Sequence, residues 1–146
     1  MSNTKPFPDV ILKWTEVFAQ RNIQEFKRFM DEEGLSPSQA NALFQLYYRG
    51  TCGVSQAAAH LGITDAAASQ MVERLVQRGL VERTEHPNDR RVKHLALTAA
   101  GRAMVEKTIA MRRFWLERLT NELTPQEQKA IAAALTTLIE AANRLE

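Results

Sequence analysis

Four polar side chains between residues 64 and 74 have the types and the spacing that suit contacts with nucleic acid. Ser69 and Gln70 are short polar groups that can reach base edges, and Arg74, one helical turn later, can reach a phosphate. Thr64 precedes them and can cap the helix that carries them. The alternative is an ordinary solvated helix face, so the neighbouring segments must decide between the two.

The stretch HPNDRRVKHLALT, residues 86–98, is a second candidate site, because it combines a charged turn with a short alternating strand. Arg90 and Arg91 at the tip of the turn could enter a narrow minor groove or bind the flanking phosphates. Asp89 is expected to brace the loop by accepting turn N–H groups and by pairing with Arg91 or another arginine. The alternative is an exposed turn whose salt bridge contributes at most about 1 kcal/mol.

The distribution of charge favours a polyanionic partner for this part of the chain. The 146 residues carry a net charge of +2, which is too small to indicate nucleic acid by itself. Residues 74–113, however, hold ten basic and four acidic side chains, whereas the rest of the chain is net acidic. The basic region therefore contains the charged turn and the arginine end of the first candidate site.

The residues that enzymes and metal sites need are sparse. The histidines are His60, His86 and His94, and neither HExxH spacing nor a CxxC, Walker, GxSxG or GxGxxG motif occurs. We therefore expect no catalytic residues, no metal and no cofactor, and a structural role for the histidines.

Cys52 is the single cysteine, so the chain cannot form an internal disulfide, which fits a reducing compartment. No apolar run approaches the roughly 18 residues of a membrane span, and the first residues lack the apolar core of a signal peptide. We expect a cytoplasmic protein. Cys52 could sense oxidants if a helix N-terminus stabilised its thiolate, or it could be a small buried filler.

Aromatic residues are numerous enough to line a pocket for a small molecule. The same side chains could instead form the core and a dimer seam, and both interpretations stay open. The candidates are Trp14, Phe18, Phe44, Tyr48 and Trp115.

Apolar periodicity and capping signals predict the elements that position these residues. Capping boxes are expected at Ser36 with Gln39 and at Thr124 with Glu127. The expected helices span about residues 8–30, 36–48, 55–61, 64–79 and 99–119 and a last segment from 124, with strands at 80–84 and 92–97 around a turn at 85–91.

Two short helices joined through GIT and followed directly by a hairpin are a winged helix-turn-helix. Leu95 and Leu97 would pin the hairpin to the core. The predicted fold is mainly α with a small β-hairpin wing, in a single domain over residues 1–146. Residues of about 36–98 would form the DNA-binding lobe, and apolar terminal helices in about 1–35 and 99–146 a dimerisation lobe.

These features together resemble the MarR family, the multiple antibiotic resistance regulators, over most of the chain. The segments AAHLGIT and SQMVERLVQRGLVER resemble the family's helix-turn-helix. The family's wing has Asp-x-Arg, an apolar strand, Leu-Thr and a glycine. Here these positions are Asp89, Arg91, Leu95, Leu97, Thr98 and Gly101.

The resemblance implies a homodimeric transcriptional repressor on a near-palindromic operator, with half-sites roughly 34 Å apart. It also implies release by a small aromatic or phenolic effector through a population shift. The chain departs from its relatives at two positions. Many relatives have a basic residue where Gln70 stands, and redox-sensing members usually have their cysteine near the first helix, whereas Cys52 lies elsewhere. The alternative is a winged helix that docks an acidic protein without specific DNA binding, and a small enzyme is a weaker third. Operator, regulated genes, effector and the choice between repressor and activator stay open.

Overall fold

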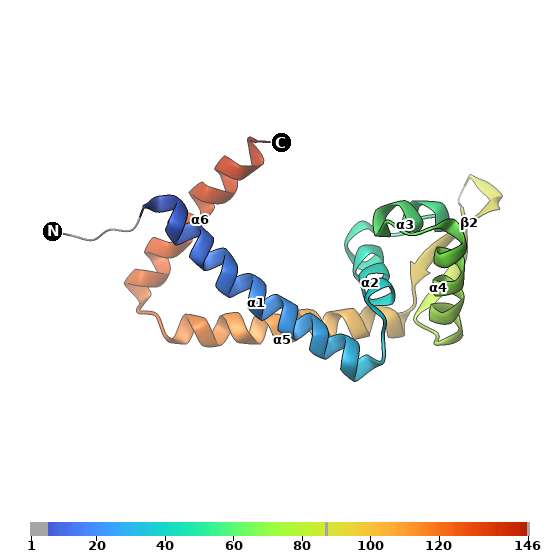
Figure 1. Ribbon diagram of the computed structural model, residues 1–146, viewed down its shortest axis with the longest axis horizontal. Coiled ribbons are helices and arrows are strands. Elements are labelled where there is room, and N and C mark those ends of the chain that lie inside the picture. Colours follow the sequence, from blue (N-terminus) through green and yellow to red (C-terminus); the bar gives the residue numbers. More distant parts are fainter. Residues whose placement is uncertain (1–5, 87, 146) are drawn as a thin grey trace. The chain divides into compact units, whose positions relative to one another are not determined.

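The computed structural model describes residues 6–86 and 88–145, except for the side chains of residues 86 and 90–92. Within this part of the chain it has six helices and one antiparallel hairpin (Figure 1). In chain order they are α1 (Phe7–Glu33), α2 (Pro37–Arg49), α3 (Val54–Leu61), α4 (Asp65–Gln77), β1 (Val81–His86), β2 (Asp89–Leu97), α5 (Ala99–Asn121) and α6 (Pro125–Asn143). The predicted mainly helical fold with a small hairpin is confirmed. None of these helices is both long and apolar enough to cross a membrane.

Local capping explains where three of the helices begin. The Ser36 hydroxyl accepts the backbone N–H of Gln39 at 3.2 Å, and the Gln39 side chain accepts the N–H of Ser36 at 2.9 Å. Thr124 and Glu127 make the same reciprocal pair at the start of α6. The Thr64 hydroxyl accepts a backbone N–H in the first turn of α4. Each cap satisfies donors that the helix itself leaves unpaired, so the predicted helix starts are confirmed.

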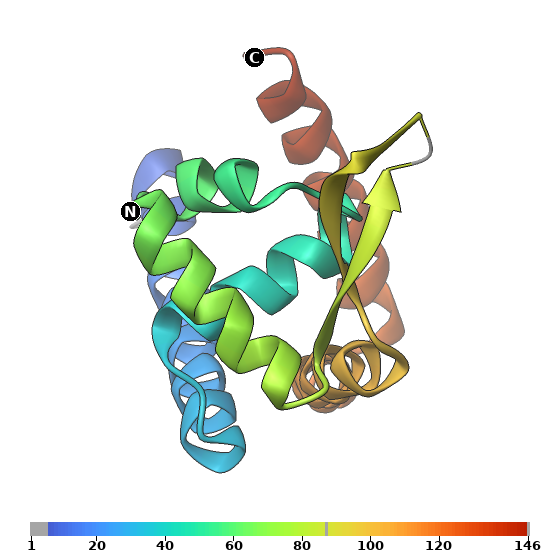
Figure 2. The ribbon, with the colours of Figure 1, turned by 90° about the vertical axis from the view of Figure 1, so that its right-hand side faces the viewer.

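The chain separates into two compact units, residues 1–109 and 110–146, and the boundary falls inside α5. In the first unit α2 packs against α3, α4 and β2, and α4 packs against α3 and β1 (Figure 2). Its core includes Phe29, Leu43, Leu46, Val72, Leu75, Leu80, Val81, Leu95 and Val105. This unit therefore buries a continuous core around the helix-turn-helix and the hairpin.

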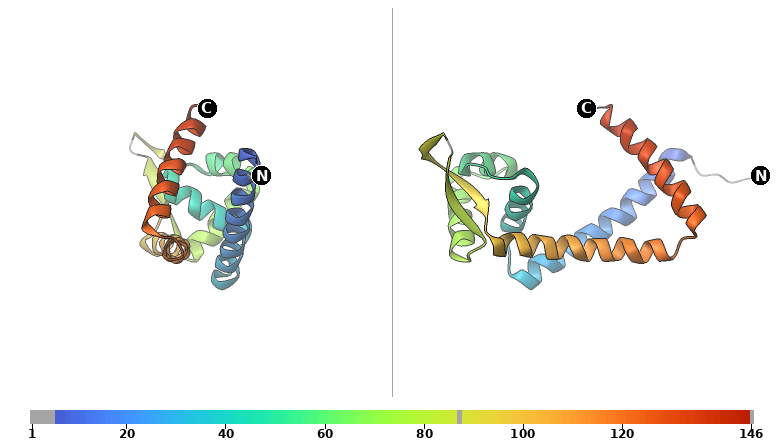
Figure 3. Two further views of the ribbon diagram at one scale, coloured as in Figure 1. Left: turned by 90° about the vertical axis from the view of Figure 1, so that its left-hand side faces the viewer. Right: turned by 180° about the vertical axis from the view of Figure 1, so that it is seen from behind.

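The hairpin runs in regular antiparallel register from Val81 opposite Leu97 to Glu85 opposite Lys93, with a shift between Glu85 and His86. The ends of β1 and β2 nearest the turn extend past α3 and α4 (Figures 1 and 3). The turn predicted over residues 85–91 is wrong in its width, because β1 continues to residue 86 and β2 starts at 89. Cross-strand pairing thus overrides the turn-forming composition of this stretch.

The second unit consists of the end of α5 and α6. The side-chain amide of Gln128 donates to the carbonyl oxygens of Thr120 at 3.0 Å and Leu123 at 2.9 Å, which fixes the connection between the two helices. No described residue of α6 is buried. This unit thus leaves its apolar side chains accessible.

Candidate nucleic-acid interface

Helix α4 has one buried face and one exposed polar face. Its buried residues are Ala68, Met71, Val72 and Leu75. They follow the spacing of one helical face and are no more than 7% exposed, so they fix the rotation of the helix. Thr64, Ser69, Gln70 and Arg74 are all exposed, as the pattern predicts. Their contact with DNA stays a prediction.

The turn between α3 and α4 sets the angle at which α4 presents this face. Gly62 is left-handed with φ of 64°, a conformation that glycine adopts at low cost. The next N–H, of Ile63, donates to the carbonyl of Ala58 at 3.1 Å. Ala58 on α3 and Ala68 on α4 are almost completely buried, and their small side chains let the two helices approach closely. The result is the predicted helix-turn-helix.

A small groove of 180 Å³ lies between α4 and the start of α2. Arg74 and Gln70 line one part of it, and Ser36 and Ser38 from α2 line another. The capping box already uses the backbone N–H groups of Ser36 and Gln39, and Pro37 has none, so the N-terminal turn of α2 contributes mainly the partial positive charge of the helix, which favours an anion. This arrangement suits a phosphate held beside a helix face that can reach bases.

Ser38 is a candidate site residue that sequence reasoning missed. The sequence marked the first turn of α2 only as a helix cap. Its place beside Arg74 depends on packing between residues that are far apart in the chain. No local signal could have revealed it, whereas the groove shows it directly.

Two ion pairs tie α4 to the hairpin and the strands to each other. Arg83 on β1 lies 3.2 Å from Glu73 on α4, and Lys93 on β2 lies 3.4 Å from Glu85 on β1. All four side chains are about half exposed, so each pair contributes at most about 1 kcal/mol. Two of the basic side chains in residues 74–113, Arg83 and Lys93, are thereby paired with carboxylates. Arg74 forms no ion pair with the side chains that the structure describes.

Arg90 and Arg91 are part of strand β2, and the structure does not describe their side chains. They are strand residues, so the expectation that they sit at the turn tip is wrong. Asp89 begins β2 opposite His86 and is exposed. Its brace to Arg91 lies outside the described residues and stays a prediction.

The connection from the hairpin to α5 is closely packed. The Thr98 hydroxyl donates to the carbonyl of Gly79 at 2.6 Å and accepts the N–H of Gly101 at 3.1 Å. A side-chain carbon at position 101 would collide with the carbonyl oxygen of Leu80. The Leu-Thr-x-x-Gly pattern thus has a physical basis, because threonine caps α5 and glycine admits the backbone beside it. Leu97 and the buried Leu95 both contact the core, as expected.

Two of the five aromatic candidates share a pocket. Phe44 and Tyr48 stack with ring centroids 6.3 Å apart and line a pocket of 370 Å³ with residues of α2 and the end of α3. Its other lining residues are Asn41, Gln45, Arg49, His60 and Leu61. The amide nitrogen of Gln45 is buried without a partner among the described residues.

The remaining aromatic candidates lie elsewhere in the chain. Trp14 and Phe18 stack on α1 at 6.1 Å and are not among the residues that line this pocket. Trp115 belongs to the unit of residues 110–146. A ligand site formed by all five residues thus stays a prediction; Phe44 and Tyr48 are the two that line this pocket.

Cys52 and the histidines show little sign of chemistry. Cys52 pairs with Leu95 through backbone hydrogen bonds of 2.7 and 3.3 Å. Burial raises the pKa of the Cys52 thiol, which lowers the thiolate fraction that oxidant sensing needs. Within the described part of the chain, no three His, Cys, Asp or Glu residues gather as a metal site.

Comparison with known proteins places these features in a family. The family model described as "MarR family" matches residues 33–92, from the end of α1 into β2. The HTH-type transcriptional repressor MdtR of Bacillus subtilis (strain 168) is 31% identical over 134 residues, which cover 92% of this chain and 86% of MdtR. The chain belongs to the MarR family. It is a transcriptional regulator with a DNA-binding winged helix.

Solved structures of MarR-like fold agree with this assignment. The crystal structure of YusO protein from B. subtilis is 30% identical, with a TM-score of 0.70 over 97% of this chain and 99% of YusO. The S. aureus MepR–DNA complex is similar in fold at 20% identity, with a TM-score of 0.67 over 87% of this chain and 96% of MepR. The predicted MarR resemblance is thus confirmed.

Proposed function

We propose that this MarR-family regulator is a homodimeric repressor that binds a near-palindromic operator and leaves it when a small aromatic or phenolic effector binds. The observation that carries the proposal is the exposed polar face of α4 beside the groove at the start of α2. The names of two similar proteins support it, since MdtR is called a repressor and MepR has been crystallised with DNA. A cytoplasmic location fits a regulator of this kind.

The proposed contacts divide by residue type. Ser69 and Gln70 face base edges in the major groove, and Thr64 sets the start of the helix that enters it. Arg74 binds a phosphate in the groove beside α2. Arg90 and Arg91 on β2 reach a neighbouring minor groove or its phosphates.

Residues 36–98 would form the DNA-binding lobe, and residues 1–35 and 99–146 the dimerisation lobe. The support is apolar surface on the terminal helices, where Phe7 is 71% and Ile139 59% exposed. Such surface marks a subunit interface. Light scattering of Ile139→Glu should show a lower mass than the parent, while Gln126→Glu on the same helix should not. A parent that is monomeric at micromolar concentration would contradict the dimer.

The effector site is proposed to include the pocket of Phe44 and Tyr48. The aromatic rings in the lining favour a planar ligand, and polar side chains of the same lining, such as Asn41 and Arg49, can pair with its polar group. A thermal-shift screen with phenols and aromatic carboxylates, followed by DNA titration with each hit, tests this. Hits that stabilise the protein but leave DNA affinity unchanged would refute the coupling.

The DNA proposal is tested by selecting duplexes from genomic fragments with the purified protein. Gln70→Ala should relax the preference for the selected sequence, because it removes a base contact. Lys129→Ala on α6 is the control and should bind like the parent. If no duplex binds even at low salt, the proposal fails, and a winged helix that docks an acidic protein is the alternative that remains.

A further inference from the structure

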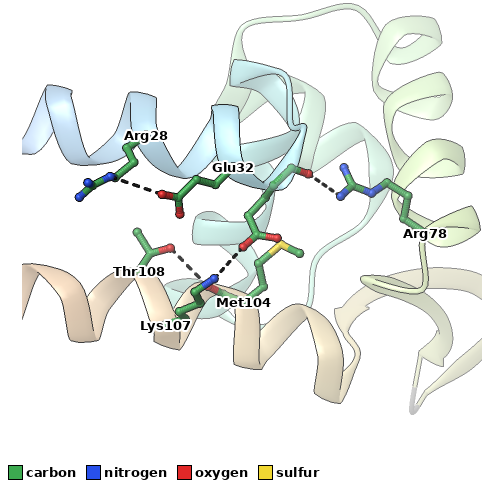
Figure 4. A network of polar contacts seen from close by, with 7 residues as sticks. Arg28, Glu32, Arg78, Met104, Lys107 and Thr108 are labelled. Carbon is green, nitrogen blue, oxygen red and sulfur yellow. Dashed lines mark hydrogen bonds and ion pairs between the residues drawn. The ribbon is translucent and has the colours of Figure 1, made fainter.

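Arg78, at the C-terminal end of α4, contacts the C-terminal end of α1. Its two terminal guanidinium nitrogens donate to the carbonyl oxygens of Gly34 at 3.1 Å and Glu33 at 2.6 Å. Figure 4 shows the side chain extending from α4 toward the last turn of α1. One forked side chain therefore joins two helices that are more than 40 residues apart in the sequence.

The electrostatics of this contact favour a cationic side chain at position 78. Both ends are helix C-termini, which carry partial negative charge and unpaired carbonyl groups. The last turn of α1 has no basic residue of its own. Glu32 pairs with Arg28 at 3.4 Å, and Glu33 pairs with Lys107 on α5 at 3.3 Å (Figure 4). Arg78 therefore supplies a positive charge and two donors to the C-terminal end of α1.

By residue type alone, Arg78 resembles Arg74, which lies one turn earlier on the same helix. Their surroundings differ, because Arg74 lines the groove beside α2 whereas both terminal nitrogens of Arg78 are directed at α1. Recognition helices contact bases mainly through their N-terminal residues, and Arg78 lies at the opposite end.

We propose that Arg78 is a positioning residue, which fixes the orientation of the recognition helix α4 against α1 and so controls DNA recognition without contacting DNA. This inference rests on the proposed DNA-binding function. A helix that is held less firmly loses the alignment needed for base contacts, while attraction to phosphates is much less sensitive to orientation.

The test compares Arg78→Ala with Arg74→Ala on two duplexes, the selected operator and a scrambled sequence of equal length. Arg78→Ala removes two solvent-exposed charge-assisted hydrogen bonds and should weaken operator binding by roughly tenfold, while binding to the scrambled duplex stays unchanged. Arg74→Ala should weaken both duplexes and lower the slope of log affinity against log salt by about 0.9. Arg78→Ala should leave that slope as in the parent.

Arg78→Lys keeps the charge but loses the fork, so it should recover part of the operator affinity. It also replaces Arg78→Ala in the test if the alanine variant does not fold. Parental operator affinity in Arg78→Ala, or an equal loss on both duplexes, would overturn the inference while the DNA function stands. Failure of the parent to bind either duplex would overturn the proposed function instead.

Discussion

Helices α4 and α6 are both amphipathic, but their apolar faces differ in burial. In α4 the apolar face is buried, and Val72 and Leu75 are each 1% exposed. In α6 Leu135 is 37% and Ile139 59% exposed, and no described residue is buried. The same periodic pattern thus accompanies a completed core in one helix and an uncovered surface in the other.

This difference shows what an amphipathic pattern determines. It specifies which face of a helix is apolar, but the surface that covers this face depends on the rest of the chain or on a second chain. Because the apolar face of α4 packs against the core, its polar face remains exposed and accessible to DNA. The apolar face of α6 is not covered within its own unit, and the proposed dimer would cover it with a second subunit.

The largest expected effect contrasts Leu75→Ala with Leu135→Ala. Leu75→Ala should lower the free energy of unfolding by about 2–5 kcal/mol, since it leaves a cavity in the core. Its loss should not depend on protein concentration. Leu135→Ala should lower the free energy of unfolding by an amount that grows with protein concentration, because it weakens the association of two subunits. Denaturant titrations at two protein concentrations measure both, and an equal, concentration-independent loss would erase the difference between the helices.

Gly101→Ala should have the second largest effect and lower the free energy of unfolding by an amount toward the upper end of about 1–3 kcal/mol. The added carbon collides with the carbonyl of Leu80, so the connection between hairpin and α5 must shift. Ala100→Ser, exposed on the same helix, is the matched control. Thermal unfolding of both variants provides the measurement, and a Gly101→Ala protein as stable as the control would show that this connection is loose.

Thr64→Ala and Thr124→Ala should each lower stability by about 1 kcal/mol, the usual effect of a lost helix cap. Both hydroxyls accept a backbone N–H in the first turn of their helix. Serine at either position should retain most of the stability. Chemical denaturation of the four variants would contradict the local account if serine and alanine behaved alike.

The smallest expected effect is a pH dependence at the start of α6. Hydrogen bonds from the backbone N–H and the hydroxyl of Thr124 hold the pKa of Glu127 below its ordinary value. A lowered folded-state pKa means that this stabilisation is present above the unfolded-state pKa and is lost as pH falls through the folded-state pKa. Stability measured across the acidic range should therefore fall less in Glu127→Gln than in the parent. Identical profiles would show that the carboxylate does not matter.

Features set by neighbouring residues could be predicted from the sequence. The caps at Ser36, Thr64 and Thr124 and the inward face of α4 depend on spacings of three or four residues. The exposed positions of Ser69 and Arg74 follow from the same periodicity.

Features set by packing between distant segments could not be predicted. The groove between Ser38 and Arg74, the contact of Arg78 with α1 and the pair of Lys107 with Glu33 join residues far apart in the chain. The turn of the hairpin was predicted too wide because strand pairing extended into a stretch that is rich in turn-forming residues.

The central claim, that the polar face of α4 is a DNA interface, is tested most directly by the salt dependence of duplex binding. Fluorescence anisotropy titrations of the parent from about 50 to 200 mM salt should show log affinity falling linearly and steeply with log salt. Arg74→Ala should bind more weakly with a slope reduced by about 0.9, while Lys129→Ala should match the parent. A parent affinity that does not change with salt, or an Arg74→Ala variant that binds like the parent, would contradict the account.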